Sequence, residues 1–327
     1  MSAPEASRGR VVGLVTSTHA AAHDTGPGHP ERPARIDALL ARLERSGIAG
    51  ELARLEAPLA DHTALTRVHP AGYVARVAAA IEGGAPYVDS PDSAVSRGSF
   101  DAALAAAGGA LAAADRIMAG AWDAAFCALR PPGHHAEEAT SMGFCLFNNA
   151  ALVARHLQAV HGLGRVAIVD WDVHHGNGTQ HLFERDPSVF YASLHESPHY
   201  PGTGARGERG LGDGEGATLN LPQPGRSGDA AWLAAFEGTL LPALEAFAPE
   251  FVIVSAGFDA HALDPLSSTR LSAQAFATFT SGLREVLGRA GWDGPGHGRL
   301  LSLLEGGYSL EGLAESADAH VAALVRG

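Results

Sequence analysis

Six short apolar runs, several of them separated by amphipathic segments, constrain the fold of this chain more than any other feature. The runs occupy residues 11–15, 124–129, 165–170, 189–195, 251–257 and 300–307. Helical periodicity appears between them at residues 32–47, 99–120, 148–162 and 229–247. Short apolar runs that alternate with helices are typical of strands buried in a parallel sheet. We therefore expect an α/β fold with an open, mostly parallel sheet, helices on both faces, and a single domain over residues 1–327.

Titratable or hydroxyl-bearing residues stand at the ends of four of these runs. In open α/β sheets, ligands bind beyond the carboxyl ends of the strands, so side chains placed there meet at one edge. The side chains concerned are His134, His135, Asp170, Asp172, His174, Asp259 and Tyr308. Taken singly, Asp172, His174 or Asp259 is more simply explained as an ordinary polar residue at a strand end. Their convergence from remote parts of the chain predicts a functional site.

The stretch VDWDVHHGNGTQ, residues 169–180, places two carboxylates and two imidazoles within six positions of a buried strand. Burying such charges together costs roughly several kcal/mol per ion unless something compensates, and a metal ion does so. Asp172, His174 and Asp259 can supply three nitrogen and oxygen ligands. Three protein ligands and one open position are typical of catalytic zinc.

The remaining strand-end residues suit amide hydrolysis at such a metal. Hydrolysis needs a base for the attacking water and an acid for the departing amine, which His134 and His135 can provide. Asp170 is a natural hydrogen-bond partner for one of these imidazoles. The phenol of Tyr308, after two glycines, can donate a hydrogen bond to a developing oxyanion.

Composition excludes several other functions. The formal net charge of −13 and the absence of any basic run argue against nucleic-acid binding. No lysine occurs, so Schiff-base and P-loop chemistry are excluded. The segment GTGARG, residues 202–207, lacks the helix of a dinucleotide site and is interpreted as a surface loop.

No apolar stretch is long enough to span a membrane, and Cys127 and Cys145 form no C-x-x-C pair. We therefore expect a cytoplasmic protein that contacts neither membrane nor nucleic acid.

Six motifs resemble, in order, those of the zinc-dependent histone deacetylase family, whose fold is the arginase–deacetylase fold. The resemblance runs from about His29 to about Leu310 and is closest to the class II branch and the bacterial deacetylase-like amidohydrolases. The motifs are HPERPARI (29–36), RPPGHHAEE (130–138), GFCLFNNAA (143–151), DWDVHHGNGTQH (170–181), SAGFDAH (255–261) and LEGGY (304–308).

The resemblance implies one zinc ion, with Asp172, His174 and Asp259 as its ligands. The resemblance assigns the family's other catalytic roles to five further residues. They are His135 as general base and acid, His134 as its electrostatic companion, Asp170 as partner of His134, Asn177 behind His135, and Tyr308 as the oxyanion donor. Asparagine at position 177 follows class II, whereas class I has aspartate, so His135 is expected to be less basic than with a carboxylate partner.

The resemblance also assigns a substrate tunnel and a structural potassium ion. Phe144 and Tyr200 would form the tunnel walls, Gly143 part of its floor, and Leu266 its rim. Leu266 stands where the polyamine-selective class II relative carries glutamate, which favours acetyl-lysine over acetylpolyamines. The potassium ion would lie near residues of two strand ends. These residues are Asp170, Asp172, His174, Ser193 and Leu194.

Several alternatives stay open on the sequence alone. The expected substrate is an acyl-lysine protein or peptide, but a small acylated amine such as an acetylpolyamine is the main alternative. An arginase-like ureohydrolase would need ligands for a second metal, and a catalytically inactive acyl-lysine binder would usually have lost Tyr308 or a ligand. His195, His199 and His261 are expected to be loop residues or supports of the site. The oligomeric state, a homo-oligomer included, and the choice between Zn²⁺ and Fe²⁺ are not determined.

Overall fold

A single eight-stranded sheet forms the centre of the protein, as seen in the computed structural model, which describes residues 10–288 and 298–326. Its strand order is β2-β1-β3-β8-β7-β4-β5-β6, and every neighbouring pair is parallel. The strands are β1 (Val12–Thr16), β2 (Leu52–Glu56), β3 (Ala124–Cys127), β4 (Val166–Asp170), β5 (Val189–Glu196), β6 (Thr218–Gln223), β7 (Phe251–Ala256) and β8 (Leu300–Leu304). The predicted α/β class and parallel sheet are confirmed, whereas the single domain over residues 1–327 stays a prediction.

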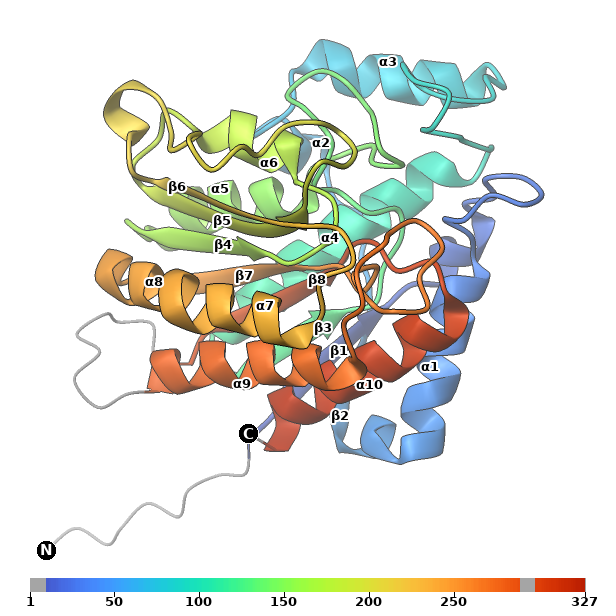
Figure 1. Ribbon diagram of the computed structural model, residues 1–327. Helices are drawn as coiled ribbons and strands as arrows, with labels where there is room; N and C mark the ends of the chain where they lie inside the picture. The colour runs from blue at the N-terminus through green and yellow to red at the C-terminus, as the bar shows by residue number, and fades with distance from the viewer. Residues whose placement is uncertain (1–9, 289–297, 327) are drawn as a thin grey trace, which may run out of the picture.

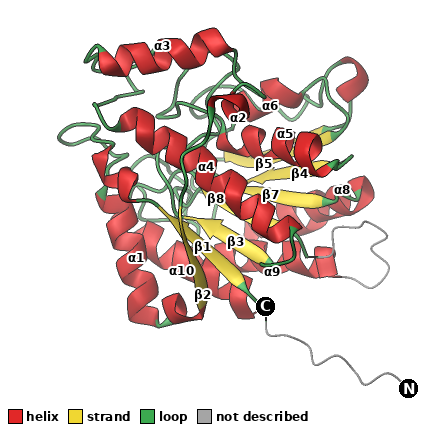
Figure 2. Cartoon of the chain, turned by 180° about the vertical axis from the view of Figure 1, so that it is seen from behind, coloured by secondary structure: helices red, strands yellow, loops and turns green. Residues whose placement is uncertain are grey.

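Helices cover both faces of this sheet (Figures 1 and 2). One face carries α1 (Ala34–Ser46), α7 (Asp229–Ala235), α8 (Leu241–Phe247), α9 (Ala273–Gly288) and α10 (Leu310–Arg326). The other carries α3 (Ala71–Glu82), α4 (Ser99–Met118) and α5 (Asn149–His161), with the short α2 (His62–Leu65) and α6 (Asn177–Phe183) nearby. The predicted helix at 229–247 is α7 and α8 joined by a π-helical turn at Phe236–Leu240.

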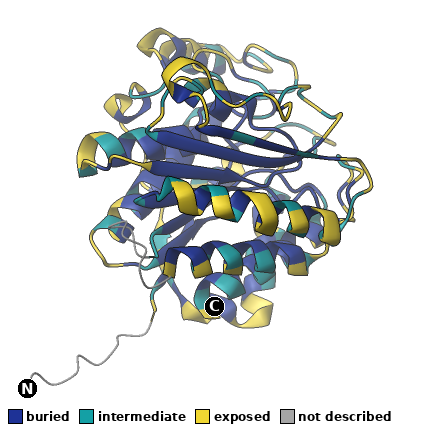
Figure 3. Cartoon of the chain, turned by 60° about the vertical axis from the view of Figure 1, so that its left-hand side comes forward, coloured by how far each residue is buried: buried dark blue, intermediate teal, exposed yellow. Residues whose placement is uncertain are grey.

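Side chains on each central strand alternate between two hydrophobic cores. On β4, Ala167 and Val169 belong to the core under α9 and α10, whereas Val166 and Ile168 belong to the core under α4 and α5. All four are fully buried, so the central strands appear uniformly buried in Figure 3. A strand that is buried on both faces reads as a continuous apolar run, which is why the sequence pattern identified it.

The two edge strands, β2 and β6, were not among the predicted runs. In β2 only Leu52 is buried and Arg54 and Glu56 are exposed, whereas β6 mixes buried with partly exposed positions. An edge strand needs few apolar residues, so its sequence lacks the run that marks a central strand.

The sheet order brings four functional strand ends together. β3, β8, β7 and β4 are consecutive neighbours, and each was predicted to end in chemically active residues. Among the described residues, none of the helices combines the length and the apolar character that a bilayer span requires.

A fully buried histidine of α10 lies away from this edge. His320 of α10 is fully buried among the rings of Phe126, Trp171 and Phe258, at centroid distances of 5.4, 5.6 and 5.8 Å. Its Nδ1 lies 2.6 Å from the Thr280 hydroxyl, whereas its Nε2 has no hydrogen-bond partner within the described part of the chain. Burial lowers the pKa of His320 to about 3, so the folded protein keeps this ring neutral.

This ring makes folding sensitive to acid. Because its pKa lies lower in the folded than in the unfolded state, the unfolded chain binds the extra proton as pH falls from about 6.5 to about 3. His320 alone should therefore reduce the free energy of unfolding by up to about 1.4 kcal/mol per pH unit in that range. We expect His320→Leu to flatten the pH dependence below about pH 6, measured by urea unfolding. An unchanged slope in this variant would contradict the assignment.

Candidate active site

Two carboxylates and one imidazole meet just beyond the ends of β4 and β7. The Nδ1 atom of His174 lies 3.0 Å from Asp172 Oδ1 and 3.1 Å from Asp259 Oδ2. Asp172 and Asp259 are almost completely buried, and His174 is 8% exposed. The three predicted metal ligands are thus brought together, each offering a donor atom within 4.8 Å of the others.

Backbone atoms approach these carboxylates closely. The Gly306 amide donates to Asp172 Oδ2 at 2.7 Å, and the Val173 amide donates to Asp259 Oδ1 at 2.8 Å. A Cβ atom at Gly306 would lie 2.1 Å from Asp259 Oδ2, so only glycine permits this approach. Burial and the neighbouring Asp172 charge raise the pKa of Asp259. A buried pair of carboxylates with one imidazole and excess negative charge is a donor set that suits a divalent cation.

His134 is held by the last residue of β4. Its Nδ1 lies 3.0 Å from Asp170 Oδ2, and Tyr191 donates its hydroxyl to the same carboxylate oxygen at 3.1 Å. Burial alone would lower the pKa of His134, but the charges of Asp172 and Asp170 outweigh it and raise that pKa to about 10. His134 therefore carries a positive charge beside the donor cluster.

His135 lies against His134, with ring centroids 4.0 Å apart, and pairs with an amide instead of a carboxylate. Its Nδ1 is 2.7 Å from Asn177 Oδ1, while the Asn177 amide nitrogen donates to Glu137 Oε1 at 2.5 Å. Because Glu137 fixes the orientation of the amide, the oxygen faces His135, so Nδ1 donates and Nε2 keeps its lone pair. Burial and the positive charges of His134 and His174 lower the pKa of His135 well below its usual value.

A buried carboxylate positions the backbone of the histidine pair. Glu305 Oε2 accepts hydrogen bonds from the amides of Gly133 and His134 at 2.6 and 3.2 Å, and Ser255 donates to Oε1 at 3.0 Å. Sequence reasoning placed Glu305 inside the motif LEGGY but gave it no role. A single buried glutamate carries no spacing signal, so only the fold reveals this contact.

A buried arginine fixes the loop that carries Tyr308. Arg35 of α1 donates to the carbonyl oxygens of Gly307 and Glu305 at 2.6 and 2.5 Å. Its guanidinium carbon lies 5.0 Å from the centre of the Tyr308 ring, over its face. Tyr308 is 8% exposed, and burial raises the pKa of its phenol well above the usual value, so the hydroxyl keeps its proton.

A cavity of about 350 Å³ opens above this cluster. The rings of Phe144 and Tyr308 meet edge to face with their centroids 5.6 Å apart, and those of His135 and Tyr200 do so with their centroids 5.2 Å apart. The residues that line the cavity are Asp92, His135, Gly143, Phe144, His174, His199, Tyr200, Leu266 and Tyr308. All four predicted tunnel residues are therefore among its walls.

Sequence reasoning did not assign two of the wall residues to the pocket. Asp92 accepts hydrogen bonds from the Gly143 amide at 3.1 Å and the Tyr200 hydroxyl at 3.2 Å. It therefore connects two segments of the cavity wall that are distant in sequence. His199 lies in a loop, as expected, but its ring also stacks on His174 at 4.8 Å. His195 lies within β5, in agreement with the predicted run at 189–195, and His261 is buried with its Nε2 2.8 Å from Glu315.

The residues predicted to surround potassium also lie close together. Asp170 of β4 pairs in register with Ser193 of β5, and Leu194 follows in the same strand. The Ser193 hydroxyl lies 2.9 Å from His195 Nδ1. Asp172 and His174 continue from the end of β4, as described above.

Comparisons with known proteins agree with this geometry. Residues 29–324 match the model of the histone deacetylase domain. The chain is 40% identical to a histone deacetylase-like amidohydrolase of Pseudomonas aeruginosa, covering 86% of this chain and 73% of that protein. It is also 40% identical to the human polyamine deacetylase HDAC10, covering 88% of this chain and 43% of that protein.

The solved structure titled "Crystal Structure of HDA15 HD domain" superposes with a TM-score of 0.90 at 37% identity, covering 97% of this chain and 88% of that one. The fold and the sequence thus match the same family over nearly the whole described length. The chain therefore belongs to the histone deacetylase family and is a hydrolytic deacetylase.

Proposed function

We propose that this deacetylase hydrolyses the amide bond between an acyl group and the ε-amine of lysine, using one zinc ion. The observation that carries the proposal is the convergence of Asp172, His174 and Asp259 beside a cavity of about 350 Å³ that His174 helps to line. The expected substrate is an acylated lysine in a protein or peptide.

These three residues would hold the zinc ion. When bound, the ion acts as a Lewis acid that activates water and polarises the amide carbonyl. Within the described residues, no second group at this edge of the sheet has three donor atoms within 4.8 Å of one another. This composition favours the deacetylase over an arginase-like ureohydrolase, which needs two bridged metals.

His135 is the residue best placed to move protons. Its Nε2 lone pair is free because Nδ1 donates to Asn177, so it can accept a proton from the attacking water and return it to the departing amine. His134 is charged because Asp172 and Asp170 raise its pKa, and it would keep the neighbouring ring neutral until the proton arrives. The two imidazoles thus have different roles because their partners differ.

Tyr308 would stabilise the negative charge that develops on the carbonyl oxygen. Its phenol stays protonated and borders the cavity. Arg35 fixes the loop that carries it by a hydrogen bond to the Gly307 carbonyl. A donor that is already positioned for the charge of the transition state needs no reorganisation during the reaction. The presence of Tyr308 and all three ligands argues against an inactive acyl-lysine binder.

The pocket walls favour an unbranched methylene chain. Phe144 and Tyr200 border the path to the cluster, and Leu266 adds an apolar group at the rim. The similarity to a polyamine deacetylase keeps an acetylpolyamine as the alternative substrate. A second ammonium group would need a carboxylate at the mouth, and the carboxylate of Asp92 is already engaged by Gly143 and Tyr200.

We also propose a structural potassium ion near Asp170, Asp172, His174, Ser193 and Leu194. The register that pairs Asp170 with Ser193 supports this proposal, because it places the two strand ends side by side.

The metal assignment predicts one tightly held divalent ion per chain. A strong chelator should abolish deacetylation, and one equivalent of Zn²⁺ should restore it. Asp259→Ala should lose the tight ion, whereas Asp115→Ala, a substitution outside the site, should retain it; elemental analysis after dialysis measures both. Two ions held with equal strength at the active site would instead support the ureohydrolase.

The hydrogen-bond pattern predicts that His135 carries its proton on Nδ1. Nuclear magnetic resonance of ¹⁵N-labelled histidine should show this tautomer, with Nε2 unprotonated. Asn177→Leu removes the acceptor and should abolish the preference, and it should lower kcat because proton transfer then lacks an oriented ring. An Nε2–H tautomer in the native protein would exclude His135 as the base.

Removing the Tyr308 hydroxyl tests its role in the transition state. Tyr308→Phe should lower kcat by ~100- to 1,000-fold with little change in KM, since one such donor typically contributes that much. Tyr200→Phe is the matched control, because its hydroxyl donates to Asp92 instead. Near-normal turnover of Tyr308→Phe would show that the phenol does not contact the reacting carbonyl.

The rim residue predicts substrate selectivity. The native protein should prefer acetyl-lysine peptides to acetylspermidine or acetylputrescine. Leu266→Glu should shift the ratio of kcat/KM values toward the polyamines, by on the order of 1 kcal/mol for a new ion pair at a partly exposed rim. Leu266→Gln, which adds length without charge, should not produce this shift. A native preference for acetylpolyamines would contradict the assignment and direct attention to Asp92.

A further inference from the structure

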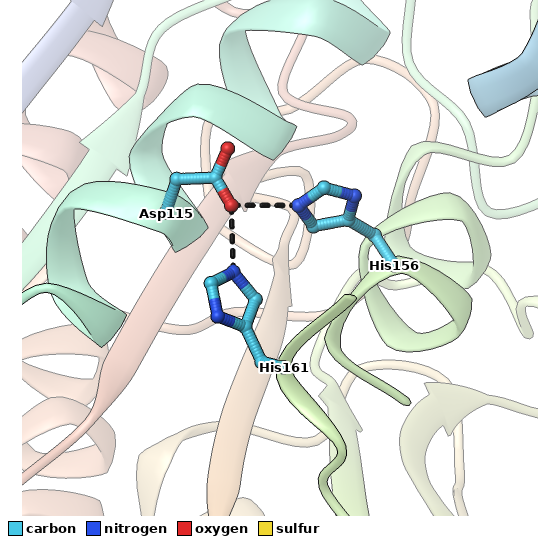
Figure 4. Close-up of side chains that lie close together, drawn as sticks. All are labelled: Asp115, His156 and His161. Carbon is cyan, nitrogen blue, oxygen red and sulfur yellow. Dashed lines mark hydrogen bonds and ion pairs between the residues drawn. The ribbon is translucent and has the colours of Figure 1, made fainter. Parts of the chain in front are cut away.

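A second cluster of metal-ligating side chains lies between α4 and α5, outside the active site. Asp115 of α4 and His156 and His161 of α5 converge there, as Figure 4 shows. Both Nε2 atoms lie 2.7 Å from the same oxygen, Oδ1 of Asp115. The two side chains of α5 therefore point at one carboxylate from different directions.

We propose that Asp115, His156 and His161 form a second metal site, which takes a divalent transition ion such as Zn²⁺. Two imidazoles and one carboxylate make a donor set that zinc and its first-row neighbours bind in proteins. All three donor atoms lie within 4.8 Å of one another. With solvent available for the remaining position, the set resembles a three-ligand zinc site.

Entry of the ion requires the Asp115 carboxylate to move away from the two imidazoles. Two donors bound to one tetrahedral zinc ion at about 2.0–2.1 Å lie about 3.3 Å apart, so Asp115 must withdraw by a fraction of an ångström. Its side chain is 49% exposed and can do so. The side chain of His156 is only 10% exposed and that of His161 22%, so packing holds the two imidazoles nearer to their positions.

A neighbouring arginine opposes binding and offers a sensitive test. The NH1 group of Arg67 lies 3.5 Å from His156 Nδ1, where it can donate to the ring nitrogen. If Nε2 binds a metal, Nδ1 must carry the hydrogen, and two donors then face each other beside a positive charge. Replacing Arg67 by glutamine removes the charge and supplies an acceptor, so it should strengthen the binding of the ion.

The ion would connect α4 to α5. Asp115 lies in the last turn of α4, and His161 is the final residue of α5 before Gly162 ends that helix in the left-handed conformation. A ligand that binds only the folded state raises the unfolding temperature, so added Zn²⁺ should stabilise the native protein through this site.

The experiment uses the full chain with its tightly held ion in place. Zn²⁺ is then added against a chromophoric competitor, with Co²⁺ as a spectroscopic probe. We expect one further, weaker ion in the native protein, and an affinity at least tenfold lower in Asp115→Ala and His161→Ala. Arg67→Gln should bind the ion several-fold more tightly.

Two controls separate this site from others. His181→Ala removes an imidazole that pairs with a single carboxylate, Glu137, and should leave the further ion in place. Asp259→Ala should lose the tight ion and keep the weaker one. The proposal is overturned if the native protein binds no further ion, or if that ion and its rise in unfolding temperature persist in both Asp115→Ala and His161→Ala.

Discussion

The structure depends on accommodating several carboxylates that are buried at one edge of the sheet. Asp170, Asp172, Asp259 and Glu305 are each at most 1% exposed. Leaving such charges uncompensated in a protein interior would cost several times what a typical hydrogen bond contributes. Backbone amides, the charged ring of His134 and the proposed cation together compensate them, at the point where the sheet order brings four strand ends together.

A second network of buried charges contacts the loop that carries Tyr308, at the same edge of the sheet. Glu31 accepts two hydrogen bonds from Arg130, at 2.5 and 2.6 Å, and one from Arg35 at 3.0 Å. Arg35 in turn binds the carbonyl oxygens of the loop that carries Tyr308. Because every partner is buried, removing one of them would leave another charge unpaired, so the loop has little freedom to move. The proposed role of Tyr308 would therefore depend on residues that do not line the cavity.

The two metal-ligating clusters show how burial changes the behaviour of the same side chains. Both contain histidine and aspartate, but the cluster at the strand ends is buried whereas Asp115 is half exposed. In the buried cluster, an ion replaces solvation that the carboxylates have lost. At the junction of α4 and α5, an ion competes with water and with an existing hydrogen bond to each imidazole. Because of this difference, we expect an ion to bind tightly at the first cluster and weakly at the second.

The sequence by itself determined the central strands, the class of the fold and the residue types of the active site. Fully buried parallel strands read as apolar runs, and the motifs that follow them, such as His134-His135 and Asp172 to His174, are short enough to be recognised locally. Only the tertiary structure decided which residues meet across long distances in the chain. It placed β8 between β3 and β7, set Glu305 beneath His134, oriented Asn177 through Glu137, and brought His156 to Asp115. The physical reason is that strand order and side-chain direction follow from the packing of the whole sheet, which leaves no periodic signal in the local sequence.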